Sequence, residues 1–192
     1  CAVLVDDYSP EVSCICLDVE HGIRAAVNHL IELGHSKIAH LAINIPKDTF
    51  QKRSWAYKDA LEEARISYNP VFEKFIDISS TRACTSTREL LNSHNPPSAI
   101  VCDDDLLAVG VYKAAKELRV KIPEELSVIG FDDIDICRIL DPELTTVSVS
   151  STELGYEACD LLIKGIKEKK VKPIHILKPV GLKIRQSTAR IK

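Results

Sequence analysis

Short hydrophobic runs alternate along the chain with longer stretches in which hydrophobic residues recur every three or four positions. The first of these longer stretches predicts a helix whose apolar face is formed by Ile23, Ala26, Val27, Leu30 and Ile31. Gly34 follows directly and predicts the end of this helix, because glycine readily adopts the left-handed conformation just after a last helical turn.

The same pattern continues through the rest of the sequence. The predicted strands cover residues 2–5, 38–42, 73–77, 98–102, 126–131, 145–149, 174–178 and 182–185. The predicted helices cover about 23–31, 50–64, 81–92, 105–118 and 152–168, with a short helical turn over 134–140. Strands that alternate with helices at this spacing predict a three-layer α/β fold with parallel sheets. In the second helix we expect the side chains of Trp55, Ala56, Ala60 and Leu61 to face inward.

Charge and hydropathy exclude two classes of partner. The net charge is −3 and the sequence pI is about 6.1, whereas a nucleic-acid-binding domain usually has a basic face and a high pI. These residues are therefore not expected to grip DNA by themselves. No apolar run approaches the roughly 18 residues that cross a bilayer, and the first ten residues lack the basic and apolar regions of a signal peptide. We expect no membrane partner.

The cysteines indicate a reducing compartment. They are scattered singly at positions 1, 14, 16, 84, 102, 137 and 159, without a Cys-x-x-Cys pair that would predict a structural zinc site. An odd number of cysteines fits the cytoplasm better than a disulfide framework, and we expect them to pack as small hydrophobic residues, Cys159 among them. The basic run 167–172 is interpreted as a solvated helix end rather than a DNA-binding patch.

Three predicted strands end in acidic residues, in the segments 6–7, 103–105 and 132–133. Ligands of open parallel sheets bind outside the carboxyl ends of the strands. Carboxylates accept hydrogen bonds in pairs, which suits the vicinal hydroxyls of a sugar or the amines of a nucleoside. The alternative is that each aspartate only caps the next helix, and this is the favoured role for Asp105 and Asp133. Three acidic ends in one fold nevertheless favour a binding site with a residue from each.

One arginine could join this site, and no motif indicates catalysis. Arg53 lies just inside the second helix, where it could bind a ligand or form an ordinary surface salt bridge. The nucleophile elbow, the Walker loop, the zinc-protease motif and the dinucleotide fingerprint are absent from the sequence, and its histidines do not cluster with cysteines or carboxylates at ligand spacing. We therefore expect no enzyme and no cofactor. The remaining enzymatic alternative is a Mg²⁺-dependent phosphotransfer domain, for which no basic partner and hydroxyl can be assembled.

Six segments, in order along nearly the whole chain, resemble motifs of the lactose/galactose-repressor (LacI/GalR) family of transcription regulators. The segments are 29–39 (HLIELGHSKIA), 53–57 (RSWAY), 97–110 (PSAIVCDDDLLAVG), 122–133 (IPEELSVIGFDD), 142–147 (PELTTV) and 185–188 (RQST). The fifth and sixth segments favour the repressors over their periplasmic sugar-binding relatives. The resemblance implies the effector-sensing domain of a transcription regulator, with a periplasmic sugar-transport receptor as the alternative.

The resemblance also implies a domain organisation. The expected fold is a two-lobed core like that of periplasmic binding proteins, with one complete C-terminal lobe formed by residues 18–147 and 179–192. A partial N-terminal lobe is expected from residues 1–17 and 148–178, with crossovers near 16–18, 147–149 and 177–179. The family's helix-turn-helix headpiece is not in this sequence, and operator DNA would be bound only through it.

By position, the family's effector-contacting residues fall on Asp6, Arg53, Asp104 and Asp132. Asp104 stands where the family usually has asparagine, so the preferred hydroxyl pattern of the effector is expected to differ. Ile78 occupies a place where an aromatic side chain often stacks on a sugar ring. This departure counts against a classic pyranose and leaves room for a smaller or linear effector.

The resemblance finally implies the partners. The effector is expected to be a sugar, a sugar acid, a sugar phosphate or a purine that binds between the lobes and biases a hinge. We expect a homodimer through the C-terminal lobe, in which the apolar turn 134–140 either forms the contact or only caps the core.

Overall fold

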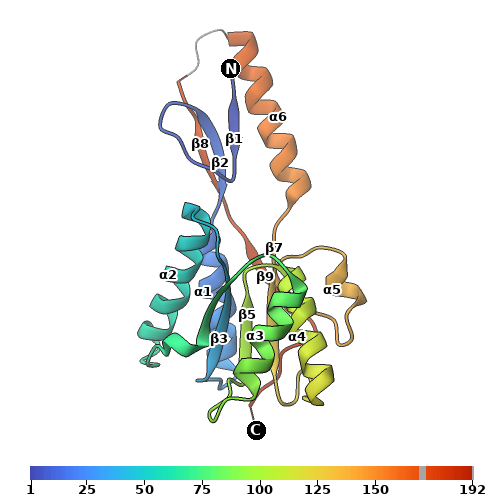
Figure 1. Cartoon of the computed structure of the whole chain (residues 1–192). Helices are drawn as coiled ribbons and strands as arrows, with labels where there is room; N and C mark the ends of the chain where they lie inside the picture. Colours follow the sequence, from blue (N-terminus) through green and yellow to red (C-terminus); the bar gives the residue numbers. More distant parts are fainter. Residues whose placement is uncertain (169–171, 192) are drawn as a thin grey trace.

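The computed structural model describes residues 1–168 and 172–191, and its strands form two sheets (Figure 1). The smaller sheet has the order β1-β2-β8 and the larger sheet the order β4-β3-β5-β6-β7-β9. Every strand pair is parallel except β7 with β9. The predicted α/β fold with parallel sheets is confirmed. The strands are β1 (Val3–Val5), β2 (Ser13–Leu17), β3 (Ile38–Ile43), β4 (Glu73–Ile76), β5 (Ala99–Cys102), β6 (Ser127–Asp132), β7 (Thr145–Ser148), β8 (His175–Lys178) and β9 (Gly181–Lys183).

Helices cover both faces of the larger sheet. α1 (Val19–Glu32) and α2 (Asp48–Glu63) pack against one face, and α3 (Ser80–Leu91) and α4 (Asp105–Leu118) against the other (Figure 1). The strands contribute side chains to the cores on both faces of the sheet, because successive side chains point to opposite faces. Ile38 of β3 belongs to the core under α1 and α2, whereas Ala39 and Leu41 belong to the core under α3 and α4. α6 (Ser151–Glu168) packs on the smaller sheet, and α5 (Ile136–Ile139) is a single turn.

The local signals that predicted α1 operate as expected. Asp18 precedes the helix, and its carboxylate accepts a hydrogen bond from the backbone N–H of His21 at 3.1 Å. Of the predicted apolar face, all but Ile31 is fully buried. Gly34 has φ +93° and ends the helix, with its N–H donating to the carbonyl of Ile31.

Two expectations about side-chain burial are wrong. Trp55 was expected to face inward, but its side chain is 56 % exposed. α2 packs through Ala56, Tyr57, Ala60 and Leu61, and a residue one position before this face is turned away by the helical rotation of about 100°. Cys159 is likewise exposed, because α6 has little core beneath it. All seven cysteines are free thiols, and Cys14, Cys84, Cys102 and Cys137 are buried.

The chain passes between the two sheets three times: from β2 to α1, from β7 to α6, and from β8 to β9 (Figure 1). Two of these segments are tied together, because the N–H of Asp18 donates to the carbonyl of Lys178 at 2.8 Å. Strand β2 was not among the predicted strands, although it forms the centre of the smaller sheet. The assignment of the lobe boundaries stays a prediction.

A segment after β9 closes the larger sheet. The Ser187 hydroxyl donates to the carbonyl of Val128 in β6 at 2.6 Å and accepts from the N–H of Thr145 in β7 at 2.8 Å. The N–H of Val128 in turn donates to the Ser187 carbonyl at 2.8 Å. Ser187 is fully buried, and its hydrogen bonds join β6 to β7 inside the fold.

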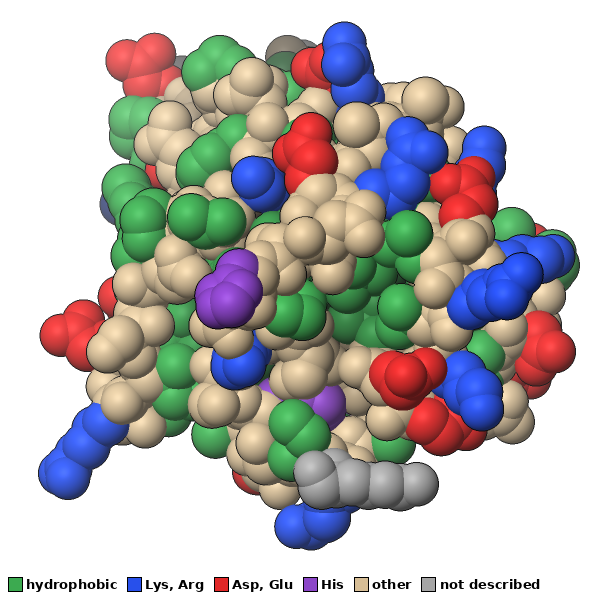
Figure 2. Space-filling model, turned by 60° about the horizontal axis from the view of Figure 1, so that its bottom comes forward, with side chains coloured by type: hydrophobic (Ala, Val, Ile, Leu, Met, Phe, Trp, Pro, Cys, Tyr) green, Lys and Arg blue, Asp and Glu red, His purple; other side chains and the backbone are tan. Residues whose placement is uncertain are grey.

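Charged side chains of both signs are interspersed on one face of the molecule (Figure 2). On the face shown in Figure 2, lysines and arginines lie among acidic and hydrophobic side chains rather than in one continuous patch. Within the described ranges, none of the helices combines the length and apolar character needed to cross a membrane. Part of the basic run 167–172, residues 169–171, lies outside the described residues.

Candidate ligand-binding site

Arg53 is held at the carboxyl end of the larger sheet. It lies in the first turns of α2 and is 4 % exposed. Its Nη1 donates to the backbone carbonyl of Asp103, just after β5, and its Cζ lies 3.7 Å from the ring centroid of Phe131, near the end of β6. These two contacts place the guanidinium beside the residues that directly precede Asp104 and Asp132.

The Nε atom of Arg53 is buried and has no hydrogen-bond partner among the described residues. A buried donor without an acceptor costs free energy, so such groups in proteins usually have a role that supplies a partner. The arginine is therefore neither a surface residue nor a simple salt bridge. It is a buried cation with one hydrogen-bond donor that no described residue uses.

Asp104 and Asp132 lie in the electrostatic field of this cation. Burial raises the pKa of Asp104, while the hydrogen bond from the Leu106 N–H and the charge of Arg53 oppose the rise. Burial raises the pKa of Asp132 to about 7, opposed by Arg53 and increased by the neighbouring aspartates. Asp132 also has φ +110°, a conformation that residues other than glycine rarely adopt. At neutral pH this edge thus presents a partly protonated carboxyl beside a guanidinium.

The expected capping roles of Asp105 and Asp133 are wrong. Asp105 is the first residue of α4, so the cap position falls on Asp104, whose carboxylate accepts from the Leu106 N–H at 2.6 Å. Asp105 is fully buried and accepts from the Thr146 hydroxyl at 2.6 Å and the Ile134 N–H at 3.0 Å. Asp133 forms ion pairs with Arg185 and Lys183.

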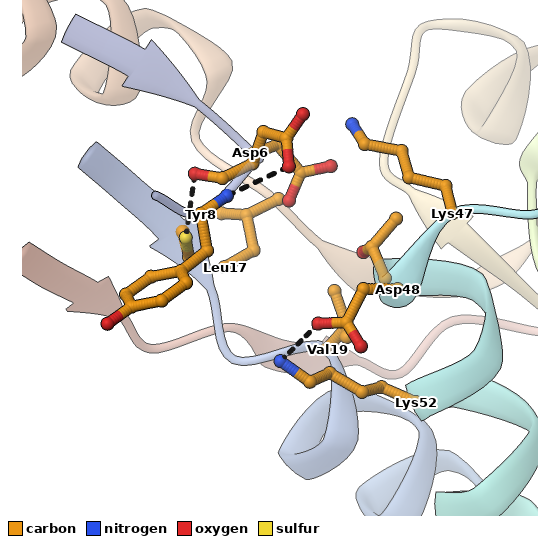
Figure 3. A pocket seen from close by; sticks show the side chains of 10 residues that line it. Asp6, Tyr8, Leu17, Val19, Lys47, Asp48 and Lys52 are labelled. Atoms are coloured by element: carbon orange, nitrogen blue, oxygen red, sulfur yellow. Dashed lines mark hydrogen bonds and ion pairs between the residues drawn. The ribbon is translucent and has the colours of Figure 1, made fainter. Parts of the chain in front are cut away.

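A pocket of about 230 Å³ opens where the two sheets meet (Figure 3). From the smaller sheet it is lined by residues that follow β1 and by the end of β2; from the other side it is lined by the loop and first turn of α2. The lining residues are Asp6, Asp7, Tyr8, Cys16, Leu17, Val19, Lys47, Asp48, Thr49 and Lys52. Both faces of the junction thus contribute charged groups to one cavity.

The five predicted site residues fall in three places. Arg53, Asp104 and Asp132 come together at the end of the larger sheet, and they are not among the residues that line the pocket. Asp6 lines the pocket from the smaller sheet, and its charge contributes to the raised pKa of Asp132. Ile78 follows β4, is 46 % exposed and does not line this pocket.

Sequence reasoning missed two groups of residues. Lys47 and Lys52 line the pocket, and Lys52 pairs with Asp48 at 2.7 Å (Figure 3). The histidines showed no clustering with carboxylates along the sequence, yet His40 contacts both Asp103 and Glu73. The one sequence signal for Lys47 and Lys52 is that both lie near the predicted start of the second helix. Across residues 1–168 and 172–191, no three or more potential metal ligands are arranged to hold an ion.

Comparison with known proteins identifies the family. The model of the periplasmic binding protein-like domain matches residues 27–188. The ribose operon repressor of Haemophilus influenzae is 37 % identical over 144 residues, which are 74 % of this chain and 43 % of the repressor. The chain spans about half the length of the curated relatives it matches.

Solved structures agree with this assignment. A LacI family transcriptional regulator from Enterococcus faecium with bound ribose superposes with a TM-score of 0.92 and 29 % identity, covering 99 % of this chain and 71 % of that one. A dimeric Lac repressor superposes with a TM-score of 0.90 and 29 % identity, covering 98 % and 69 % of the two chains. The chain therefore belongs to the periplasmic-binding-protein-like domain family and, within it, to the LacI type of transcription regulators.

Proposed function

We propose that this chain senses a small-molecule effector for a transcription regulator and has no enzymatic activity. The observation that carries the proposal is the buried, unpartnered Nε of Arg53 beside Asp104 and Asp132. A ligand oxygen would complete the hydrogen bonding of the guanidinium, and ligand hydroxyls would donate to the carboxylates. The relatives are repressors, which favours regulation over the transport alternative.

The proposed mechanism is a hinge controlled by the effector. Residues 18–147 and 179–192 form one lobe, and residues 1–17 and 148–178 contribute to the other. Asp6 would contact the effector from the second lobe while Arg53 contacts it from the first. An effector that touches both sides binds the closed form more tightly, and it shifts the population only by this difference in affinity.

The proposed effector is a small polyhydroxylated compound, with a pentose as the first candidate. Two similar proteins are named for ribose or contain it. Sugar acids and sugar phosphates remain in the test set because Lys47 and Lys52 line the pocket and Arg53 is a buried cation, so these groups could bind an anion. Purines remain in it because carboxylates could accept hydrogen bonds from their amino groups.

The proposed assembly is a cytoplasmic homodimer that binds operator DNA through a helix-turn-helix headpiece outside this sequence. Ile139 in α5 is 73 % exposed and Ile134 is 41 % exposed, so this turn offers apolar surface that does not cap the core. A similar solved structure is a dimeric repressor. Burial of two copies of this turn against each other would suit a twofold interface.

The test is a thermal-shift screen of D-ribose, other sugars, sugar acids, sugar phosphates and purines. An effector present at about a hundred times its dissociation constant should stabilise the fold by about 2.7 kcal/mol. Arg53→Ala should abolish the shift. Arg24→Ala is the matched control, because the ion pairs of Arg24 with described residues are surface pairs with Asp59 and Glu63. The proposed function is wrong if no compound gives a shift that Arg53 controls.

A further inference from the structure

A cluster of charged residues is buried behind Arg53, under α2. His40 lies in the middle of β3 and is fully buried. Its Nε2 lies 2.9 Å from Oδ1 of Asp103, after β5, and its Nδ1 lies 3.5 Å from Oε1 of Glu73, in β4. Both carboxylate side chains are at most 1 % exposed. The imidazole thus lies between two carboxylates, with a hydrogen-bond contact to Asp103 and, on the other side, an ion-pair contact to Glu73 that is too long or too poorly aligned for a hydrogen bond.

The two carboxylates favour a protonated imidazole. Burial disfavours the charged form, but Asp103 and Glu73 outweigh it and raise the pKa of His40 to about 9. Burial also disfavours the charged form of Glu73, yet the neighbouring His40 ring and the contacts from Ser54, Tyr68 and Lys58 lower its pKa to about 2. Lys58 contributes the second positive charge, at 2.9 Å from Glu73 Oε2. Two cations therefore compensate two buried anions.

Each carboxylate holds a different part of the Arg53 region. Asp103 receives the N–H of Ile43 at 2.9 Å on Oδ2, and its own backbone carbonyl accepts from the Arg53 guanidinium. Glu73 accepts from the hydroxyl of Ser54, the residue next to Arg53 in α2. His40 therefore contacts both Asp103, whose carbonyl accepts from the Arg53 guanidinium, and Glu73, which accepts from the helix that carries Arg53.

We propose that His40 is the positioning residue of Arg53: its imidazolium, fixed between Asp103 and Glu73, orients the guanidinium before any effector arrives. The inference rests on the proposed function only in treating Arg53 as an effector contact. The orientation of Arg53 is a property of the protein alone. Preorganisation of this kind reduces the ordering that a ligand must impose on binding.

The experiment measures Arg53 directly by ¹H–¹⁵N NMR of the arginine side chains, without any effector. The Arg53 signals are identified by their loss in Arg53→Lys. In the unsubstituted chain we expect a slowly exchanging Nε–H and resolved Nη signals, because the group is buried and fixed. In His40→Gln we expect the Nε–H to exchange about tenfold faster or more, since local opening becomes easier.

His35→Gln is the matched control. His35 is buried to a similar degree in the same lobe, where it contacts the Ser98 hydroxyl at 2.8 Å and the Ala189 carbonyl at 3.0 Å, away from Arg53. It should lose stability but leave the Arg53 signals unchanged. Unchanged Arg53 signals in a folded His40→Gln variant would overturn the proposal, as would an equal change in both variants.

Two further measurements keep the proposal testable if His40→Gln does not fold. The triple variant His40→Gln, Glu73→Gln, Asp103→Asn removes all three charges together, and it should fold with a mobile Arg53. In the unsubstituted chain, both ring nitrogens of His40 should carry protons at pH 7 by ¹⁵N NMR. A neutral His40 ring would refute the proposal. Failure of every effector in the thermal-shift screen would leave these results unaffected.

Discussion

Replacement of Asp132 by asparagine should stabilise the fold, and by more at pH 8 than at pH 5. The pKa of Asp132 is about 7 in the folded chain, against an ordinary value of 3.8. A carboxyl whose folded pKa is raised contributes stability at low pH and loses it as the pH rises through the folded value. The ionised carboxylate thus weakens the folded state at neutral pH, and asparagine removes this effect.

The magnitude follows from the interval between pH 5 and pH 7. There the unfolded carboxyl is ionised while the folded one keeps its proton, and each pH unit costs about 1.4 kcal/mol, or about 3 kcal/mol in total. Asp132 is not fully buried, and solvent screening reduces this to about 1–2 kcal/mol. Urea unfolding of both proteins at pH 5 and pH 8 measures the difference.

The comparison of the two pH values separates charge from backbone. Asp132 has φ +110°, and asparagine tolerates positive φ well, but this backbone effect is the same at both pH values. Only the change in the stability difference between pH 5 and pH 8 reports the carboxylate. The reasoning is refuted if Asp132→Asn gives the same difference at both pH values, or a smaller gain at pH 8.

Three further substitutions test packing, the buried network and the surface. In Gly110→Ala the new methyl would lie 2.3 Å from a backbone carbonyl of α3, so urea unfolding should show a free energy of unfolding lower by about 1–2 kcal/mol. In Gly155→Ala the new methyl has no described atom within 4 Å, and the free energy of unfolding should rise by up to about 1 kcal/mol. Thr146→Val removes the hydroxyl that donates to buried Asp105, so a loss of about 1.5–3 kcal/mol is expected in the same assay; an unchanged midpoint would contradict the role of this bond. Ile139→Glu should shift the proposed dimer to monomer in sedimentation equilibrium with little change in unfolding, because the side chain is 73 % exposed; a dimer that persists argues against α5 as the interface.

Local signals predicted most helices and strands, though not β2, but they could not predict contacts between residues far apart in the sequence. The apolar face of α1 and its Gly34 terminus depend on residues close in sequence, and both were predicted correctly. Trp55 was placed wrongly because neighbouring hydrophobic residues in α2 span more than one face, and composition alone does not select which face meets the sheet. Periodicity identifies buried positions but not the partner that lies across the sheet.

The site shows the same division. The rule that ligands bind at the carboxyl ends of parallel strands brought Asp104 and Asp132 to one edge, and the structure places Arg53 beside them. His40 lies in a hydrophobic strand, and its partners Glu73 and Asp103 come from two other strands. Nothing in the spacing of these residues along the chain pairs them, so this cluster could not be predicted from the sequence.

The fastening of β6 to β7 by Ser187 has a consequence for the order of folding. Ser187 follows α6 and β8 in the chain, although it completes a sheet whose other strands, apart from β9, precede them. During synthesis from the N-terminus, the ribosome must therefore release α6 and β8 before Ser187 can join β6 and β7 in the larger sheet. Until then the buried backbone groups of Val128 and Thr145 that Ser187 satisfies lack these partners, and the nascent larger sheet should remain a substrate for chaperones.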